Sequence, residues 1–180
     1  MTNLGHIGSV ERFARHWPWM ALLACAAMLA IAHAFETFGH MAPCSLCLKE
    51  RQIYWAAGAI AALAAASNLT SRGALAARFA NALLVLAFLY SAVVAGYHAG
   101  AEWKLWPGPT SCSGGQLNVN AGDLTAFLKG APMVVPACDK AAWVFLGLSM
   151  AGWNALISLG LAGASALAAA QGKQGEGRFS

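Results

Sequence analysis

The feature that most constrains this chain is a set of four long apolar stretches with almost no charge on any face. They cover approximately residues 19–38, 53–69, 79–100 and 141–170. A helix of about 20 apolar residues crosses the ~30 Å hydrocarbon core of a bilayer. The second stretch is short and mostly alanine, and small residues suit close packing inside a bundle. The pattern predicts an all-α membrane protein, a bundle of four transmembrane helices.

The composition excludes other classes of protein. Hydrophobic residues make up 59% of the chain and charged residues 10%, against roughly 45–50% and about 25% in soluble chains. A soluble helical bundle needs polar outer faces, which these stretches lack. The basic residues are scattered at the ends of the stretches, so we expect no nucleic-acid partner. One alternative concerns the first stretch only. Residues 32–34, Ala-His-Ala, resemble the cleavage site of a signal peptide, and cleavage there would leave the rest of the topology unchanged.

Charge also predicts the orientation. In a four-span chain the N-terminal tail, the second connection and the C-terminal tail share one side. These segments carry six basic residues, Arg12, Arg15, Arg72, Arg78, Lys173 and Arg178. The positive-inside rule therefore places both termini in the cytoplasm and loops 39–52 and 101–140 outside. We expect residues 1–170 to form a single membrane domain and residues 171–180 a disordered cytoplasmic tail.

The second outer loop is long and is interrupted by proline and glycine. Within it, Asn120 and Asp123 fit the start of a short helix, with Asn120 as the N-cap. The apolar face of that helix suits either the membrane surface or packing on the bundle.

The five cysteines indicate the chemistry. Cys25 falls inside the first apolar stretch, where a lone thiol is usually a small buried hydrophobe. The other four fall in the outer loops, with Cys44 and Cys47 as a Cys-x-x-Cys unit and Cys112 and Cys138 in the long loop. Structural disulfides, a four-cysteine zinc site and redox exchange all fit such pairs. The wide separation of the second pair disfavours zinc, so no metal is expected.

The Cys-x-x-Cys unit favours redox exchange. A disulfide across two residues closes a very small ring and stabilises little. Pro43 restricts the entry to the helix, whose N-terminus lowers the pKa of a thiol. Arg51 lies one turn after Cys47 on the same face. Arg51 can hold a thiolate or polarise the carbonyl of a ligand, or it can simply anchor the helix at the lipid headgroups. Oxidation of a dithiol beside a membrane favours a lipid-soluble quinone as the electron acceptor.

Several segments carry a resemblance to a known family. They are Pro43-Cys-Ser-Leu-Cys-Leu-Lys-Glu-Arg51, Leu89-Tyr-Ser-Ala92 with His98, the pair Cys112 and Cys138, and Trp143-Val-Phe-Leu-Gly-Leu-Ser-Met150 with Trp153. Over most of its length the chain resembles the disulfide-bond formation protein B (DsbB) family of bacterial inner-membrane thiol oxidases. The resemblance implies a thiol:quinone oxidoreductase that supports disulfide formation in the periplasm.

The resemblance also implies a relay. A reduced periplasmic DsbA-like oxidase of the thioredoxin fold would attack the loop disulfide and form a mixed disulfide with Cys112. Cys138 would exchange with Cys44 and release Cys47 as a thiolate. Cys47 would then donate to ubiquinone or menaquinone, with Arg51 stabilising the developing charge, and the quinol would carry the electrons to the respiratory chain.

His98 matches a histidine near the outer end of the third helix in this family, which implies a role at the quinone site. The alternative is an ordinary polar residue at the membrane interface. The chain departs from the family pattern at Cys112-Ser-Gly-Gly115, which is richer in glycine than expected and leaves the identity of the partner open. The Ser45-Leu46 interior of the Cys-x-x-Cys unit also affects the redox potential.

Two other functions compete with this one. The vitamin K epoxide reductase-like family also links cysteines to a quinone, but its loop pair precedes the Cys-x-x-Cys unit, whereas here it follows. The other is a small transporter or membrane scaffold with structural disulfides, and transport would need charges or broken helices near the membrane midplane. Glu36 and His33 are the candidates, and both lie towards the outer end of the first helix.

Overall fold

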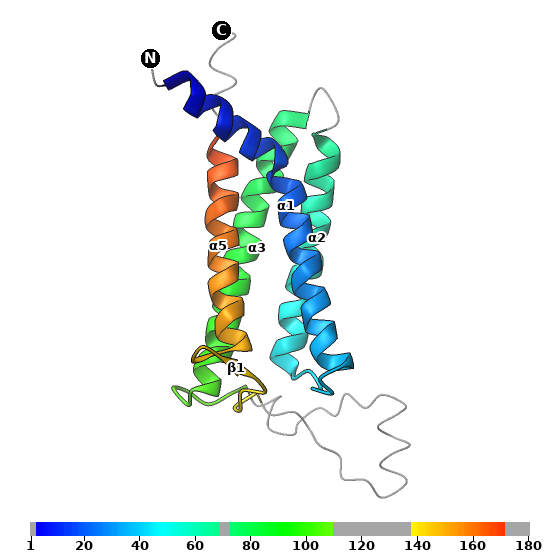
Figure 1. Ribbon diagram of the computed structural model, residues 1–180, viewed down its shortest axis with the longest axis vertical. Coiled ribbons are helices and arrows are strands. Elements are labelled where there is room, and N and C mark those ends of the chain that lie inside the picture. The colour runs from blue at the N-terminus through cyan, green and yellow to red at the C-terminus, as the bar shows by residue number, and fades with distance from the viewer. Residues whose placement is uncertain (1–2, 69–72, 110–137, 172–180) are drawn as a thin grey trace, which may run out of the picture.

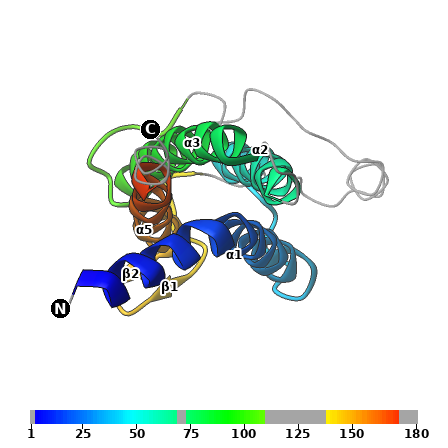
Figure 2. The ribbon, with the colours of Figure 1, turned by 90° about the horizontal axis from the view of Figure 1, so that it is seen from above.

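The computed structural model describes residues 3–68, 73–109 and 138–171. Within these residues four helices form the bundle, α1 (Asn3–Thr37), α2 (Ser45–Ser67), α3 (Gly73–Glu102) and α5 (Met150–Gln171). Successive helices run in opposite directions, so the N- and C-terminal ends of the bundle lie together (Figure 1). Seen from above, the helices form a ring in the order α1, α2, α3, α5, in which α5 closes against α1 (Figure 2).

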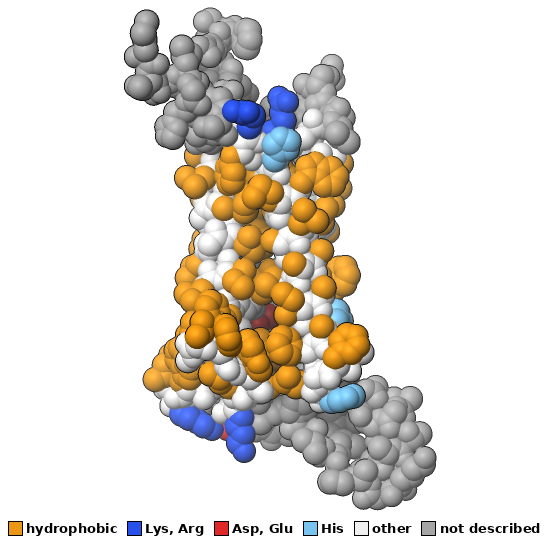
Figure 3. Space-filling model, viewed as in Figure 1, with side chains coloured by type: hydrophobic (Ala, Val, Ile, Leu, Met, Phe, Trp, Pro, Cys, Tyr) orange, Lys and Arg blue, Asp and Glu red, His pale blue; other side chains and the backbone are white. Residues whose placement is uncertain are grey.

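The outer surface of the bundle is apolar. Among the described residues, α1, α3 and α5 each contain a segment long and apolar enough to cross a membrane, namely Arg12–Thr37, Leu75–Glu102 and Met150–Ala170. Helix α2 is not in this group because Lys49, Glu50 and Arg51 occupy its first two turns and the rest is mostly alanine. Figure 3 shows apolar side chains covering the sides of the bundle, with Lys and Arg gathered at its two ends.

The core of the bundle consists largely of small side chains. The buried alanines on α1, α2 and α5 surround two larger residues of α3, Leu84 and Phe88, which are fully buried. Small residues allow helix backbones to approach closely, which suits packing where lipid removes the hydrophobic driving force. Hydrogen bonds cross this core as well. The Trp17 indole donates to Ser165 at 3.0 Å and so ties α1 to α5.

Three helices begin earlier than the sequence predicted, and one of them, α3, starts at Gly73 rather than near residue 79. Helix α1 starts at Asn3 rather than near residue 19, and it continues through Pro18. Proline removes one backbone hydrogen bond without ending the helix, and the segment before it leans away from the bundle axis (Figure 1). Helix α2 starts at Ser45 rather than near residue 53. Lysine, glutamate and arginine are good helix formers, so the charged residues that ended the apolar stretch do not end the helix.

The prediction that the fourth helix starts near residue 141 is wrong. Residues 144–149 form a small hairpin, in which β1 (Val144–Phe145) pairs antiparallel with β2 (Leu148–Ser149). Leu146 and Gly147 between them have φ of 50° and 79°. Two successive positive φ values give the type I′ turn that matches the twist of a hairpin. Helix α5 therefore begins at Met150, not near residue 141. Cys112, the short helix expected at Asn120 and residues 172–180 of the tail lie outside the described residues.

Candidate active site

The Cys-x-x-Cys unit lies at the N-terminus of α2. Cys44 is the N-cap, with extended backbone (φ −77°, ψ 173°), and its sulfur accepts a hydrogen bond from the backbone N–H of Cys47 at 3.3 Å. The two sulfurs are 3.0 Å apart and both cysteines are free thiols. The hydrogen bond between these sulfurs holds the pKa of the Cys44 thiol below its ordinary value. At the N-cap position the positive end of the helix dipole also stabilises a thiolate.

The loop cysteine Cys138 lies directly beside this unit. Cys138 is disulfide-bonded and buried. Its sulfur lies within 4.8 Å of both the Cys44 sulfur and the His98 Nε2 atom. Cys44, Leu46 and Cys138 pack together as a small buried cluster. The structure therefore brings three of the four predicted redox cysteines together, with a reduced pair next to an oxidised loop sulfur.

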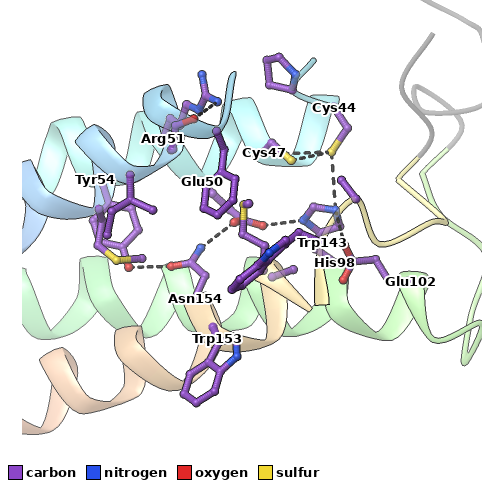
Figure 4. Close-up of a pocket in the computed structure, with 18 of the residues that line it drawn as sticks. Cys44, Cys47, Glu50, Arg51, Tyr54, His98, Glu102, Trp143, Trp153 and Asn154 are labelled. Atoms are coloured by element: carbon purple, nitrogen blue, oxygen red, sulfur yellow. Dashed lines mark hydrogen bonds and ion pairs between the residues drawn. The ribbon is translucent and has the colours of Figure 1, made fainter. Parts of the chain in front are cut away.

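His98 of α3 lies on the other side of Cys44 and is held by a carboxylate of α2. Its Nε2 atom is 3.6 Å from the Cys44 sulfur, and its Nδ1 atom is 2.8 Å from Glu50 Oε1. The second oxygen of Glu50 accepts a hydrogen bond from the Asn154 amide of α5 at 2.6 Å. The Tyr54 hydroxyl in turn donates to the Asn154 carbonyl at 2.7 Å. Figure 4 shows this continuous chain from Tyr54 to Cys44.

The sequence prediction named His98 but missed Glu50, Tyr54 and Asn154. A signal was present in their spacing. Glu50 and Tyr54 are four residues apart on one face of α2, and Asn154 and Ser158 are four apart in an otherwise apolar helix. Polar residues that repeat at helical spacing inside a membrane-spanning segment point towards the bundle interior.

Arg51 faces α1 instead. Its guanidinium forms an ion pair with Glu36 and donates to the backbone carbonyl of Ala32 at 3.0 Å. The side chain is 14% exposed, so two fixed acceptors on α1 hold this cation at the edge of the bundle. Glu36, which the sequence offered as a candidate for a transporter, is therefore the partner of Arg51.

The donor set Cys44, His98 and Cys138 is close enough to be compared with a metal centre. Cysteine ligates metals as a free thiolate. Cys138 is in a disulfide here, so this set holds only two available soft donors in this redox state.

A cavity of about 380 Å³ opens between α1, α2 and α5. The polar and charged side chains that line it include Cys47, Glu50, Arg51, His98 and Glu102. An aromatic wall is formed by Phe35, Trp143 and Phe145. The ring centroid of Trp143 lies 5.3 Å from that of Phe35 and 5.6 Å from that of Phe145. In Figure 3 an acidic group is visible inside a hollow in the apolar surface.

The cavity suits a flat, apolar ring with polar substituents. Its volume lies in the range of small-molecule sites, which combine apolar walls with a few placed polar groups. Among the described residues, the buried Glu102 Oε2 atom has no hydrogen-bond partner. An acceptor left unpaired in a buried site is available to a hydroxyl group of a ligand. A quinone head group has the flat ring and polar oxygens, and its reduced form, the quinol, has the hydroxyl groups.

Comparison with known proteins gives one consistent result. The family model described as "Disulfide bond formation protein DsbB" matches residues 14–168. A relative from Methylococcus capsulatus, "Disulfide bond formation protein B", is 33% identical over 156 residues, which are 82% of this chain and 89% of the relative. A relative of the same description from Azoarcus sp. is 31% identical over 149 residues, which are 79% of this chain and 84% of the relative. No solved structure shows a significant match to the chain.

Proposed function

Because the chain belongs to the DsbB family of disulfide bond formation proteins, and so is a membrane protein with disulfide oxidoreductase activity, we propose that it transfers electrons from a periplasmic dithiol oxidase to a membrane quinone. The partner would be a DsbA-like protein of the thioredoxin fold, and the membrane would be the bacterial inner membrane. The proposed topology has four crossings with both termini in the cytoplasm, so that the Cys44 end of the bundle faces the periplasm.

The observation that carries this proposal is the position of the Cys44 sulfur beside two other sulfurs. The Cys47 sulfur is 3.0 Å away and the Cys138 sulfur lies within 4.8 Å. Disulfide exchange needs a thiolate beside a disulfide sulfur. In this structure the Cys44 thiol lies beside the disulfide sulfur of Cys138, so exchange between them needs only a short movement and couples the loop disulfide to the Cys-x-x-Cys unit.

The proposed relay assigns a role to each cysteine. The partner's thiolate attacks the disulfide that we assign to Cys112 and Cys138, and it forms a mixed disulfide with Cys112. The Cys138 thiolate released in that step attacks Cys44 in the oxidised Cys44–Cys47 state of the unit, so that a Cys44–Cys138 disulfide forms and Cys47 leaves as a thiolate. Cys47 lines the cavity together with Arg51, so the electrons arrive beside the aromatic wall.

A quinone, when bound, supplies an acceptor for two electrons and two protons. Cys47, Arg51 and His98 are the residues that would hold it, since all three line the cavity. Arg51 supplies a fixed positive charge, because Glu36 and the Ala32 carbonyl hold the guanidinium in place. A preorganised cation stabilises negative charge that develops on an oxygen without further reorganisation. The apolar walls exclude water, which strengthens that effect. The quinol formed would return electrons to the respiratory chain.

The test is a turnover assay with the purified full-length protein in detergent. A reduced DsbA-like oxidase and a ubiquinone analogue are added, and quinone reduction is followed optically, with a menaquinone analogue in parallel. We expect wild type to turn over, Cys47→Ser and Cys138→Ser to be inactive, and Arg51→Ala to need far more quinone. Cys25→Ala is the matched control, because Cys25 is a buried thiol of the bundle core that does not line the cavity, and it should behave as wild type.

The opposite result would favour a non-enzymatic membrane scaffold. In that case quinone is untouched by wild type, and the cysteine variants lose stability without any change in redox behaviour. The proposal then fails, and the disulfide of Cys138 is a structural one.

A further inference from the structure

A buried chain of hydrogen bonds ends on the sulfur of Cys44. It runs from Tyr54 to Asn154, from Asn154 to Glu50, from Glu50 to His98 and from His98 to Cys44. Glu50 and His98 are each less than 10% exposed, so water does not compete for these contacts. Three helices contribute, which means that the arrangement exists only in the folded bundle.

The chemistry of the members fixes the direction of the chain. The Asn154 amide donates to Glu50 Oε2, so this carboxylate acts as an acceptor. With Glu50 ionised, its carboxylate only accepts hydrogen bonds, and the Nδ1 atom of His98 then carries the proton towards Glu50 Oε1. In a neutral imidazole the other nitrogen is then an acceptor. The Nε2 lone pair therefore faces the Cys44 sulfur, 3.6 Å away.

This arrangement is that of an activated nucleophile, a thiol beside a base that a third group orients. We propose that His98 accepts the proton of Cys44 as the Cys44–Cys47 dithiol is oxidised, and that Glu50 and Asn154 are positioning residues that hold His98 in the required tautomer. The proposal rests on the proposed function, because that function names the quinone as the acceptor.

The step balances in atoms and electrons. Oxidation of the dithiol forms the bond between the Cys44 and Cys47 sulfurs and removes two electrons and two protons. The electrons go to the quinone, which also takes up two protons when it is reduced to the quinol. The Cys44 proton moves first to His98 Nε2, and Glu50 balances the charge of the imidazolium within the buried site. The structure holds the reduced pair and the oxidised loop sulfur, which is the state that precedes this step.

Several charged or titratable groups surround His98. Helix α2 and its N-cap contribute Cys44, Cys47 and Glu50, and α3 contributes Glu102, whose Oε1 atom is 3.8 Å from His98 Nε2. Among the described residues that line the same cavity, α5 adds the uncharged Asn154, α2 adds Arg51, and the segment before β1 adds Lys140. Glu102 is not part of the hydrogen-bonded chain, so its role can be separated from that of Glu50.

The test uses the full-length protein without quinone, in detergent, with the loop disulfide intact. The thiolate of Cys44 is followed against pH by its ultraviolet absorbance and by its rate of alkylation with iodoacetamide, located by mass spectrometry. The variants are His98→Gln, Glu50→Gln and Asn154→Ala. Lys49→Gln is the matched control, because Lys49 is an exposed charged neighbour of Glu50. A second measurement follows single-turnover quinone reduction by the same proteins across the same pH range.

We expect His98→Gln to lower Cys44 reactivity at neutral pH by about tenfold or more, and the variants to converge with wild type at alkaline pH, where hydroxide removes the proton directly. Glu50→Gln should have a similar effect and Asn154→Ala a smaller one. In Lys49→Gln the Cys44 thiol should titrate as it does in wild type. Asn154→Ala keeps both ionisable groups, so it remains informative if Glu50→Gln folds poorly.

Either of two results would overturn the proposal. One is a Cys44 titration in His98→Gln and Glu50→Gln that matches wild type. The other is an equal loss of reactivity at every pH, because that indicates structural damage rather than a lost base. If Cys44 depends on His98 as expected but wild type never reduces quinone, the proton acceptor stands as a feature of Cys44 and the proposed function fails.

Discussion

Two adjacent residues of α2, Glu50 and Arg51, anchor two differently built regions of the molecule. Glu50 faces α3 and α5, where its side chain is 11% exposed and that of its partner His98 is 5% exposed. Arg51 faces α1, where its side chain is 14% exposed and that of its partner Glu36 is 39% exposed. Both line the same cavity.

This difference in exposure separates the region that stabilises the fold from the region that is open to a ligand. The Glu50 region is more deeply buried, and an uncharged donor from Asn154 completes it. Removing one member of a buried pair leaves its partners without water, which is strongly destabilising. The Arg51 region is half open, so Glu36 can be hydrated when Arg51 is replaced. We therefore expect the Glu50 region to control stability and proton transfer and the Arg51 region to control quinone binding.

The largest effect should come from Glu50→Ala. This variant leaves the His98 and Asn154 donors unpaired in the buried core, so the free energy of unfolding should fall by about 3–5 kcal/mol. Denaturant unfolding in mild detergent measures it. Lys49→Ala, in the neighbouring exposed position, should change the free energy of unfolding by less than about 0.5 kcal/mol. Equal changes in the two variants would mean that the Glu50 region is no more protected from solvent than the surface.

Arg51→Gln should separate binding from stability. The KM for quinone should rise about tenfold, equivalent to about 1.4 kcal/mol of lost interaction, while the free energy of unfolding changes by less than about 1 kcal/mol. Glu36→Gln keeps an acceptor for the guanidinium and should raise the KM less. The contrast between the two regions is lost if Arg51→Gln unfolds as readily as Glu50→Ala.

Cys47→Ala should alter the acidity of Cys44. The hydrogen bond between the sulfurs holds the pKa of Cys44 below its ordinary value, so the thiolate persists as the pH falls below the usual thiol range. Without the Cys47 sulfur the pKa of Cys44 should rise, and alkylation at neutral pH should slow. The pH profile of Cys44 alkylation measures this, with Cys25→Ala as the control. An unchanged profile would mean that His98 and the helix N-terminus are sufficient to set the acidity of Cys44 without the Cys47 sulfur.

The smallest effect should come from Lys104→Met at the same end of the bundle. Lys104 donates to Asp139 at 2.7 Å, and both side chains are largely exposed. Lys104 holds the pKa of Asp139 below its ordinary value, so this pair contributes above the unfolded pKa of Asp139 and is lost as the pH falls through the folded one. Solvent screens such a pair, and we expect no measurable change in the unfolding midpoint at neutral pH. A clear drop in the unfolding midpoint would show that exposure alone does not distinguish stabilising pairs from neutral ones.

The sequence predicted the class of fold because lipid imposes a simple requirement. Apolar segments of spanning length are visible in composition alone, and three of the four helices meet that requirement. The resemblance to the DsbB family, carried by Cys44 to Arg51 and by the second cysteine pair, is confirmed by the family model. Element boundaries were less accurate where polarity was taken as the end of a helix. Lys49 and Arg51 lie inside α2, and Gly147, with its positive φ, lies in the turn of a hairpin rather than in a helix.

The sequence by itself determined that this is a helical membrane protein with a Cys-x-x-Cys unit at the start of a helix. Local spacing and hydrophobicity suffice for both conclusions. Only the tertiary structure decided which side chains meet. The spacing of Glu50 and Tyr54 places both on one face of α2, but it does not pair Glu50 with Asn154, which lies 104 residues further along the chain. Contacts across that separation depend on how the ring of helices closes. Packing therefore decides which groups pair with a buried charge. A charge is removed from water, and so needs a partner, only in the folded bundle.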